Sequence, residues 1–160
     1  MAAQADTAVL DGLRALGEEL PFNRHLGVEV VELTTGCART RLQADERLAN
    51  HVGGVHAIAE LAPVELAGAL AASGRLAPLL GRGYVPVVGG LTVRYVAPAR
   101  GVLYATADVG EDVVAPALAA ADAGERPRVE VEVAVTDAQD TTVASASLTF
   151  VYLEMAATSG

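Results

Sequence analysis

Residues 50–56 read Asn50-His51-Val52-Gly53-Gly54-Val55-His56, and an almost wholly apolar run from Ala57 to Ala72 follows them. Two adjacent glycines allow backbone conformations and close approaches that side chains forbid, so this stretch predicts a tight turn. The run after it predicts a buried helix from Val55 to Ser73, closed by Gly74, because it has no polar stripe. Two carboxylates in that helix, Glu60 and Glu65, need a partner or a function, because a buried ionised carboxylate is destabilising.

The segments on both sides of this helix predict strands. The alternating, β-branched pattern from Leu26 to Ala44 predicts two strands joined at Gly36. Residues 6–20 predict a leading amphipathic helix that ends at Pro21, and residues 111–126 predict either a short helix or a loop. Four further strands are predicted at residues 84–98, 102–109, 128–136 and 142–153. This order predicts an α+β fold in which one curved antiparallel sheet covers a long central helix.

The composition indicates one domain over residues 1–160, with the leading helix at about 6–20 and a core at about 22–153. A chain of 160 residues that is 52% hydrophobic and 19% charged is long enough for one well-buried core and short for two. Its net charge of −9 argues against binding to nucleic acid or to an anionic membrane. No segment resembles a secretory signal or a bilayer-crossing helix, so we expect a cytoplasmic protein.

The residue inventory excludes several classes of function. The sequence contains no Lys, which excludes a phosphate-binding P-loop and Schiff-base chemistry. Cys37 is the only cysteine, so no intrachain disulfide forms, and we expect a small buried hydrophobe there. A metal site of His51, His56 and Glu60 is conceivable, but their order does not match the helical zincin pattern. We expect no metal and no other cofactor, and we expect Glu60 to reach solvent or an arginine at the helix edge.

Asn50, His56 and Glu65 fit acyl chemistry better than metal binding. The amides just after the glycines would form a helix N-terminus, where unpaired N–H groups stabilise the negative charge of a carbonyl oxygen under attack. The donor nearest the turn is the backbone N–H of Ala57. Glu65 is eight residues further on, roughly 12 Å along the helix axis, so the two groups cannot reach one carbonyl within one helix. Two antiparallel helices from two chains would bring them together across a two-fold axis.

In that arrangement Glu65 would act as a general base on water or as a nucleophile, while Asn50 orients the water or the carbonyl. A purely structural interpretation also exists for each residue. Asn50 would then form the turn, His56 would cap the helix or pack, and Glu65 would be a buried acceptor. The three residues together at these spacings favour the catalytic interpretation.

These residues resemble the hot dog fold thioesterases, in particular the phenylacetate-pathway type and its uncharacterised relatives. That family's pattern has an Asn, a His six residues later and an Asp or Glu nine residues after the His. Asn50, His56 and Glu65 fit all three positions. The stretch from Val93 to Ala99 is also similar to the family, and the likeness covers about residues 22–153.

The resemblance implies a homodimer or a dimer of dimers that hydrolyses acyl thioesters, most often acyl-CoA. It implies that Glu65 acts across the subunit interface, that the Ala57 amide binds the carbonyl, and that Asn50 and His56 shape the turn. CoA enters as part of the substrate, and its phosphates need local positive charge, for which Arg82 and Arg100 are candidates. Gly53 and Gly54 complete the expected substrate-binding residues.

This sequence departs from the family's pattern in three places. Ala57 and Ile58 replace two glycines, and Pro63 is expected to interrupt the helix before Glu65. Residues 87–90 carry no hydroxyl, although some relatives supply one there. The alternative is a non-catalytic hot dog module that binds acyl-CoA or serves as a structural partner. A hot dog dehydratase ranks lower, because the Asp and His motif of those enzymes has no counterpart here.

Overall fold

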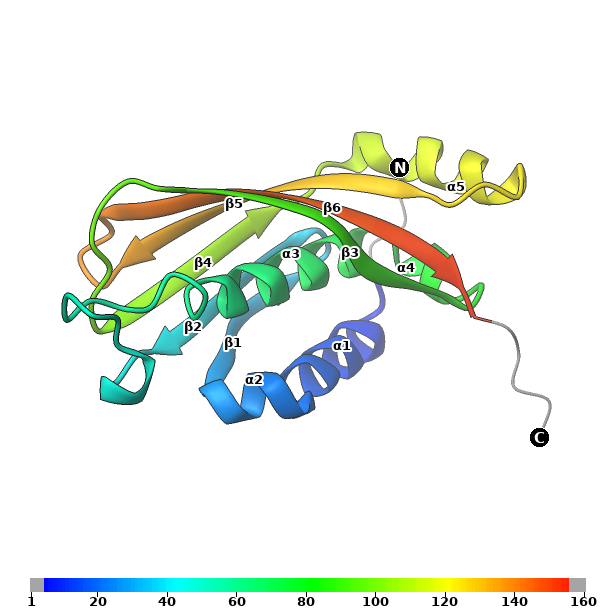
Figure 1. Ribbon diagram of the computed structural model, residues 1–160. Helices are drawn as coiled ribbons and strands as arrows, with labels where there is room; N and C mark the ends of the chain where they lie inside the picture. Colours follow the sequence, from blue (N-terminus) through cyan, green and yellow to red (C-terminus); the bar gives the residue numbers. More distant parts are fainter. Residues whose placement is uncertain (1–4, 156–160) are drawn as a thin grey trace.

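A curved antiparallel sheet wraps around one central helix in this protein (Figure 1). The structure, a computed structural model, describes residues 5–155. Over these residues the sheet has six strands in the order β1-β2-β4-β5-β6-β3, and every neighbouring pair is antiparallel. The strands are β1 (Val28–Thr34), β2 (Cys37–Gln43), β3 (Tyr84–Tyr95), β4 (Val102–Asp108), β5 (Arg128–Asp137) and β6 (Thr142–Glu154). The predicted α+β architecture is confirmed.

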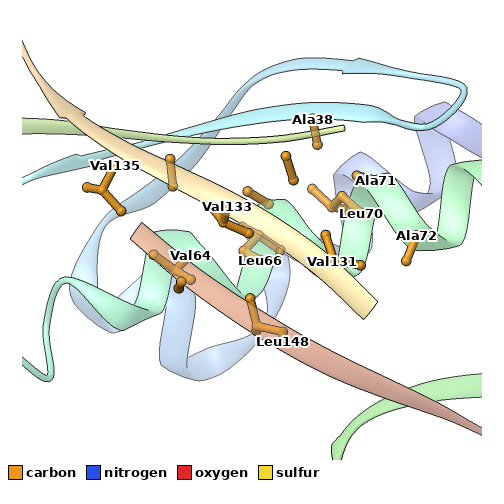
Figure 2. Close-up of a cluster of buried hydrophobic side chains, with 14 of the residues drawn as sticks. Ala38, Val64, Leu66, Leu70, Ala71, Ala72, Val131, Val133, Val135 and Leu148 are labelled. Atoms are coloured by element: carbon orange, nitrogen blue, oxygen red, sulfur yellow. The ribbon is translucent and has the colours of Figure 1, made fainter. Parts of the chain in front are cut away.

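The central helix, α3 (Leu61–Arg75), lies between the sheet and the N-terminal helices α1 (Thr7–Glu19) and α2 (Pro21–Leu26) (Figure 1). Eleven of its fifteen residues are buried, which explains why its sequence has no polar stripe. Val64, Leu66 and Leu70 of α3 belong to one buried cluster with the valines of β5 and Leu148 of β6 (Figure 2). The helix therefore forms the middle of the hydrophobic core.

The predicted start of the central helix at Val55 is wrong by six residues. The N–H of Val55 donates to the carbonyl of Ala99 at 2.9 Å, and the N–H of His56 donates to the carbonyl of Leu48 at 2.7 Å. The bond to Leu48 belongs to a β-bridge between Val55 and Ala49, and the bond to Ala99 uses the N–H of Val55 itself, so the helix does not begin there. One irregular turn over residues 57–60 then leads into α3 at Leu61.

Pro63 does not interrupt the helix, contrary to the sequence prediction. It is the third residue of α3 and lies in the first turn, where backbone N–H groups have no partner within the helix. Its carbonyl accepts a hydrogen bond from the buried Thr40 hydroxyl of β2 at 2.7 Å. The predicted end of the helix is also too early, because Gly74 lies within α3, which ends at Arg75. A Cβ at Gly74 would lie 3.0 Å from the carbonyl oxygen of Thr34.

The segment after the leading helix also differs from the prediction. Pro21 ends α1 as expected but opens a second helix, α2, because proline suits the first helical position. Asn23 joins the two helices by donating to the carbonyl of Gly17 at 2.8 Å. Four short helical segments complete the described structure: 3₁₀ turns at Glu46–Leu48 and Glu111–Val113, α4 (Ala77–Leu80) and α5 (Val114–Asp122). Of the two alternatives for residues 111–126, the short helix is right.

No helix within residues 5–155 combines the length and the apolar character needed to cross a membrane.

Candidate active site

Asn50 organises the turn that precedes the central helix. Its Oδ1 accepts the N–H groups of Val52 at 3.0 Å and of Gly54 at 2.9 Å. Its Nδ2 donates to the carbonyl of Val55 at 3.0 Å, and its backbone N–H donates to the carbonyl of Gly54 at 2.8 Å. The side chain thus closes the loop of residues 50–55, and one N–H of its amide group makes no hydrogen bond among the described residues.

Both glycines of the turn are required by geometry. Gly53 has a φ of 74°, a left-handed conformation that side chains disfavour. A Cβ on Gly54 would lie 3.1 Å from the carbonyl oxygen of Ala99, closer than side chains normally come. The carbonyl of Gly53 accepts a hydrogen bond from the Arg100 guanidinium, which fixes that side chain beside the turn.

Among the described residues, the turn leaves two backbone N–H groups without an acceptor, those of His51 and Ala57. Of these two residues, Ala57 is the one that lines a cavity beside the turn. His56 accepts hydrogen bonds from the two backbone N–H groups after that of Ala57. Its Nδ1 accepts from Ile58 at 3.2 Å, and its carbonyl accepts from Ala59 at 2.8 Å. The Tyr95 hydroxyl of β3 donates to the carbonyl of Ala57 at 2.7 Å, which fixes the Ala57–Ile58 peptide directly after that N–H. Within the described part of the chain, the N–H of Ala57 meets no acceptor.

A cavity of about 610 Å³ opens beside the turn. Its walls are Asn50, Val52, Gly54, Val55, Ala57, Glu60 and the segment 95–100. Four residues predicted for the site therefore share one cavity: Asn50, Gly54, Ala57 and Arg100. Gly53 lines a smaller neighbouring cavity of about 340 Å³ together with Arg100. His56 is exposed and lines neither of these two cavities.

Glu60 belongs to this cavity, which the sequence interpretation missed. The side chain was expected to reach solvent or an arginine, but the residue is only 5% exposed. Its Oε2 is buried and has no hydrogen-bond partner among the described residues. Burial raises the pKa of Glu60 to about 7. Pro63 indicates this position in the sequence. Proline favours the first turn of a helix, so the helix starts just before Pro63 and Glu60 lies in the turn that precedes it.

Glu65 lies on α3, away from this cavity. It lines two depressions, one beside α1 and the start of β3, the other beside α2, Ile58 and the middle of β3. Burial raises the pKa of Glu65 above its usual value. Over residues 5–155 its carboxylate makes no hydrogen bond and no ion pair. Within one chain, Glu65 therefore does not line the cavity that contains the Ala57 amide.

The two candidate arginines have different surroundings. Arg100 borders both cavities of the turn, and no carboxylate among the described residues pairs with it. Arg82 lies after α4 and pairs with Asp122 of α5 at 2.7 Å. It lines neither of the two cavities of the turn. Of the two, only Arg100 shares a cavity with the Ala57 amide.

Residues 5–155 contain no group of three His, Cys, Asp or Glu side chains placed to hold a metal ion.

Within this range, β3 is one of the two edge strands of the sheet and pairs only with β6. Apolar side chains along its twelve residues are exposed, among them Val85, Val87, Val88 and Leu91. A long apolar edge of this kind favours pairing with another chain.

A family model described as "Domain of unknown function (DUF4442)" matches residues 13–152. The chain belongs to the DUF4442 family. No curated protein sequence matches it. The match covers every strand of the sheet except the last two residues of β6, so the DUF4442 domain contains the turn, the cavity and Glu65 together.

Solved structures share this DUF4442 fold. A Pseudomonas aeruginosa protein described as a probable thioesterase is 23% identical, with a TM-score of 0.78 over 91% of this chain and 95% of that chain. The Escherichia coli PaaI protein of the phenylacetic acid degradation operon is 16% identical, with a TM-score of 0.70 over 91% and 93%. A Haemophilus influenzae thioesterase is 18% identical, with a TM-score of 0.74 over the whole of both chains. The DUF4442 chain has the same hot dog fold as these proteins.

Proposed function

We propose that this protein hydrolyses acyl thioesters, with acyl-CoA as the substrate class. The observation that carries the proposal is the free N–H of Ala57, held beside a cavity by His56 and Tyr95. A fixed backbone donor next to a cavity suits the oxygen of a thioester carbonyl, whose negative charge grows as a nucleophile attacks. The named activities of the structural neighbours agree with this chemistry.

The reaction also needs a carboxylate, and we assign this role to Glu65 of a second copy of the chain. Its carboxylate has no partner within residues 5–155 of its own chain and lies beside the exposed edge of β3. Pairing of two β3 edges would bury their apolar side chains and set two α3 helices against each other. The proposed assembly is a homodimer or a dimer of dimers, and each dimer has two composite sites.

In the composite site the thioester carbonyl accepts the Ala57 N–H of one chain. Glu65 of the other chain takes a proton from water as the water oxygen attacks, or attacks the carbonyl itself to give a mixed anhydride. Asn50 keeps the turn in shape, and its uncommitted amide N–H can orient the water or the carbonyl. His56 leaves the Ala57 N–H free by accepting the next amide.

Arg100 is assigned to the phosphates of CoA. The guanidinium is held beside the turn through Gly53 and has no carboxylate partner in the described residues. Arg100→Ala is expected to raise KM for acyl-CoA several-fold, with a smaller salt dependence, because one phosphate contact is lost. KM for the same acyl group on N-acetylcysteamine, which has no phosphate, should not change. Arg82→Ala, measured in parallel, tests the second candidate arginine.

The function is tested by incubating the protein with acyl-CoAs of increasing chain length and measuring the free thiol released. We expect cleavage of at least one of them. Acyl-CoA that binds in calorimetry but is never cleaved would contradict the enzyme assignment and indicate the non-catalytic binding module instead.

A further inference from the structure

Among the described residues, Glu60 is the one carboxylate that lines the cavity beside the Ala57 amide. Its buried Oε2 faces no hydrogen-bond donor within residues 5–155, and the residue is 5% exposed. A buried carboxyl group without a partner lowers stability, so a purely structural role does not explain it. Neither the proposed base nor the proposed carbonyl donor accounts for this group.

The position of Glu60 relative to Ala57 suits a role on the same substrate. The carbonyl of His56 accepts the N–H groups of both Ala59 and Glu60, so the irregular turn over residues 57–60 is wound about as tightly as one turn of a helix. Side chains three residues apart on such a turn lie about 5–6 Å apart at Cβ. A thioester whose oxygen accepts the Ala57 N–H would therefore place its carbon and sulfur within reach of the Glu60 carboxyl.

The charges around Glu60 leave it able to hold a proton near neutral pH. Burial raises its pKa to about 7, so both protonation states are populated there. The titratable groups that face it across the cavity are Tyr95 of β3 and Arg100 of the following loop. The pKa of Tyr95 is raised by burial and then by the charge of Glu60. The guanidinium of Arg100 is bound to Gly53 and makes no ion pair with Glu60.

On the basis of the proposed thioesterase function, we propose that Glu60 is the general acid that protonates the leaving sulfur. Water attacks the carbonyl carbon and gives one proton to Glu65 of the second copy, while the C=O electron pair moves onto the oxygen held by Ala57. When the intermediate collapses, the C–S bond breaks, its electron pair stays on sulfur, and the Glu60 proton forms the S–H bond. Glu65 then releases its proton to solvent, and Glu60 regains one.

The test compares Glu60→Gln with the wild type on one acyl group attached to two leaving groups. The thiolate of CoA is strongly basic, so its departure is faster when a proton is supplied to the sulfur. A nitrothiophenolate is a stable anion and departs without that proton. We expect Glu60→Gln to lower kcat by about 10- to 100-fold on acyl-CoA and less than threefold on the aryl thioester. An equal loss on both substrates would overturn the proposal. Wild-type protein that cleaves neither would instead overturn the thioesterase function on which it rests.

The pH dependence gives a second readout. A general acid must be protonated, so kcat of the wild type on acyl-CoA should fall as pH rises through about 7, and this fall should be absent in Glu60→Gln. Folding should show the same titration without any substrate. Because the folded-state pKa is raised, wild-type stability should fall relative to Glu60→Gln between pH 4.5 and 7. A difference in Tm that does not depend on pH would overturn the assignment.

Glu132→Gln is the matched control for both measurements. Glu132 is exposed on β5, between the buried Val131 and Val133, and lines none of the cavities described above. It carries the same change of charge, so it should leave the ratio of the two substrates and the pH profile as in the wild type.

Discussion

Glu65→Gln is expected to lower kcat for thioester hydrolysis by about 10²–10⁴-fold, because the amide can neither take a proton from water nor attack the carbonyl. The fold should survive, since the Glu65 carboxylate makes no ion pair within residues 5–155 and glutamine has nearly the same shape. Acyl-CoA binding should change little, because the carboxylate is assigned to the chemical step. Free thiol release, calorimetric binding and the oligomeric state measured by light scattering check the three parts of this expectation.

The wild-type pH profile should identify the same group. A base or nucleophile works only when ionised, so the rate should rise as pH increases through the pKa of Glu65, which burial sets above its usual value. Glu132→Gln should retain this ascending limb. If Glu65→Gln keeps more than a tenth of the wild-type rate, Glu65 is not the catalytic carboxylate.

Ala57→Pro is expected to produce the second large loss, about 10²–10³-fold in kcat, because proline removes the one backbone N–H assigned to the carbonyl oxygen. No hydrogen bond within residues 5–155 depends on that N–H, so the fold loses none. Steady-state kinetics and thermal unfolding should therefore separate the two effects, with a large fall in rate and a small change in Tm.

Ala57→Gly is the comparison variant for this position. It keeps the N–H and removes only a methyl group, so its rate should stay far above that of Ala57→Pro. Equal rates for the two variants would mean that the amide does not stabilise the reacting oxygen.

The sequence predicted most of the fold because its local signals agree with the tertiary structure. The absence of a polar stripe between Ala57 and Ala72 identified the buried helix, and the β-branched alternation identified all six strands. Gly36 marked the hairpin between β1 and β2, because its φ of 86° in that turn is a conformation that favours glycine. The same local reasoning failed at Val55, whose N–H donates to Ala99, 44 residues further along the chain, while Val55 forms a β-bridge with Ala49.

The site could be predicted only in part. The spacing of Asn50 and Ala57 within one short turn was enough to place both beside one cavity. Tyr95 was beyond reach, because its contact with Ala57 spans 38 residues and two elements. Glu60 was misassigned for a different reason. A helix started too early puts residue 60 on a helical face, whereas the observed start at Leu61 leaves it in the turn that borders the cavity.

Each active site is proposed to combine the Ala57 amide of one chain with Glu65 of another. A heterodimer of two inactive variants, Glu65→Gln and Ala57→Pro, tests this arrangement. The variants carry different affinity tags, are co-expressed, and the heterodimer is isolated with both tags. One of its two sites then contains an intact amide and an intact carboxylate, so we expect about half of the wild-type activity per dimer. A purified heterodimer as inactive as its two parents would show that the two groups do not act together across an interface.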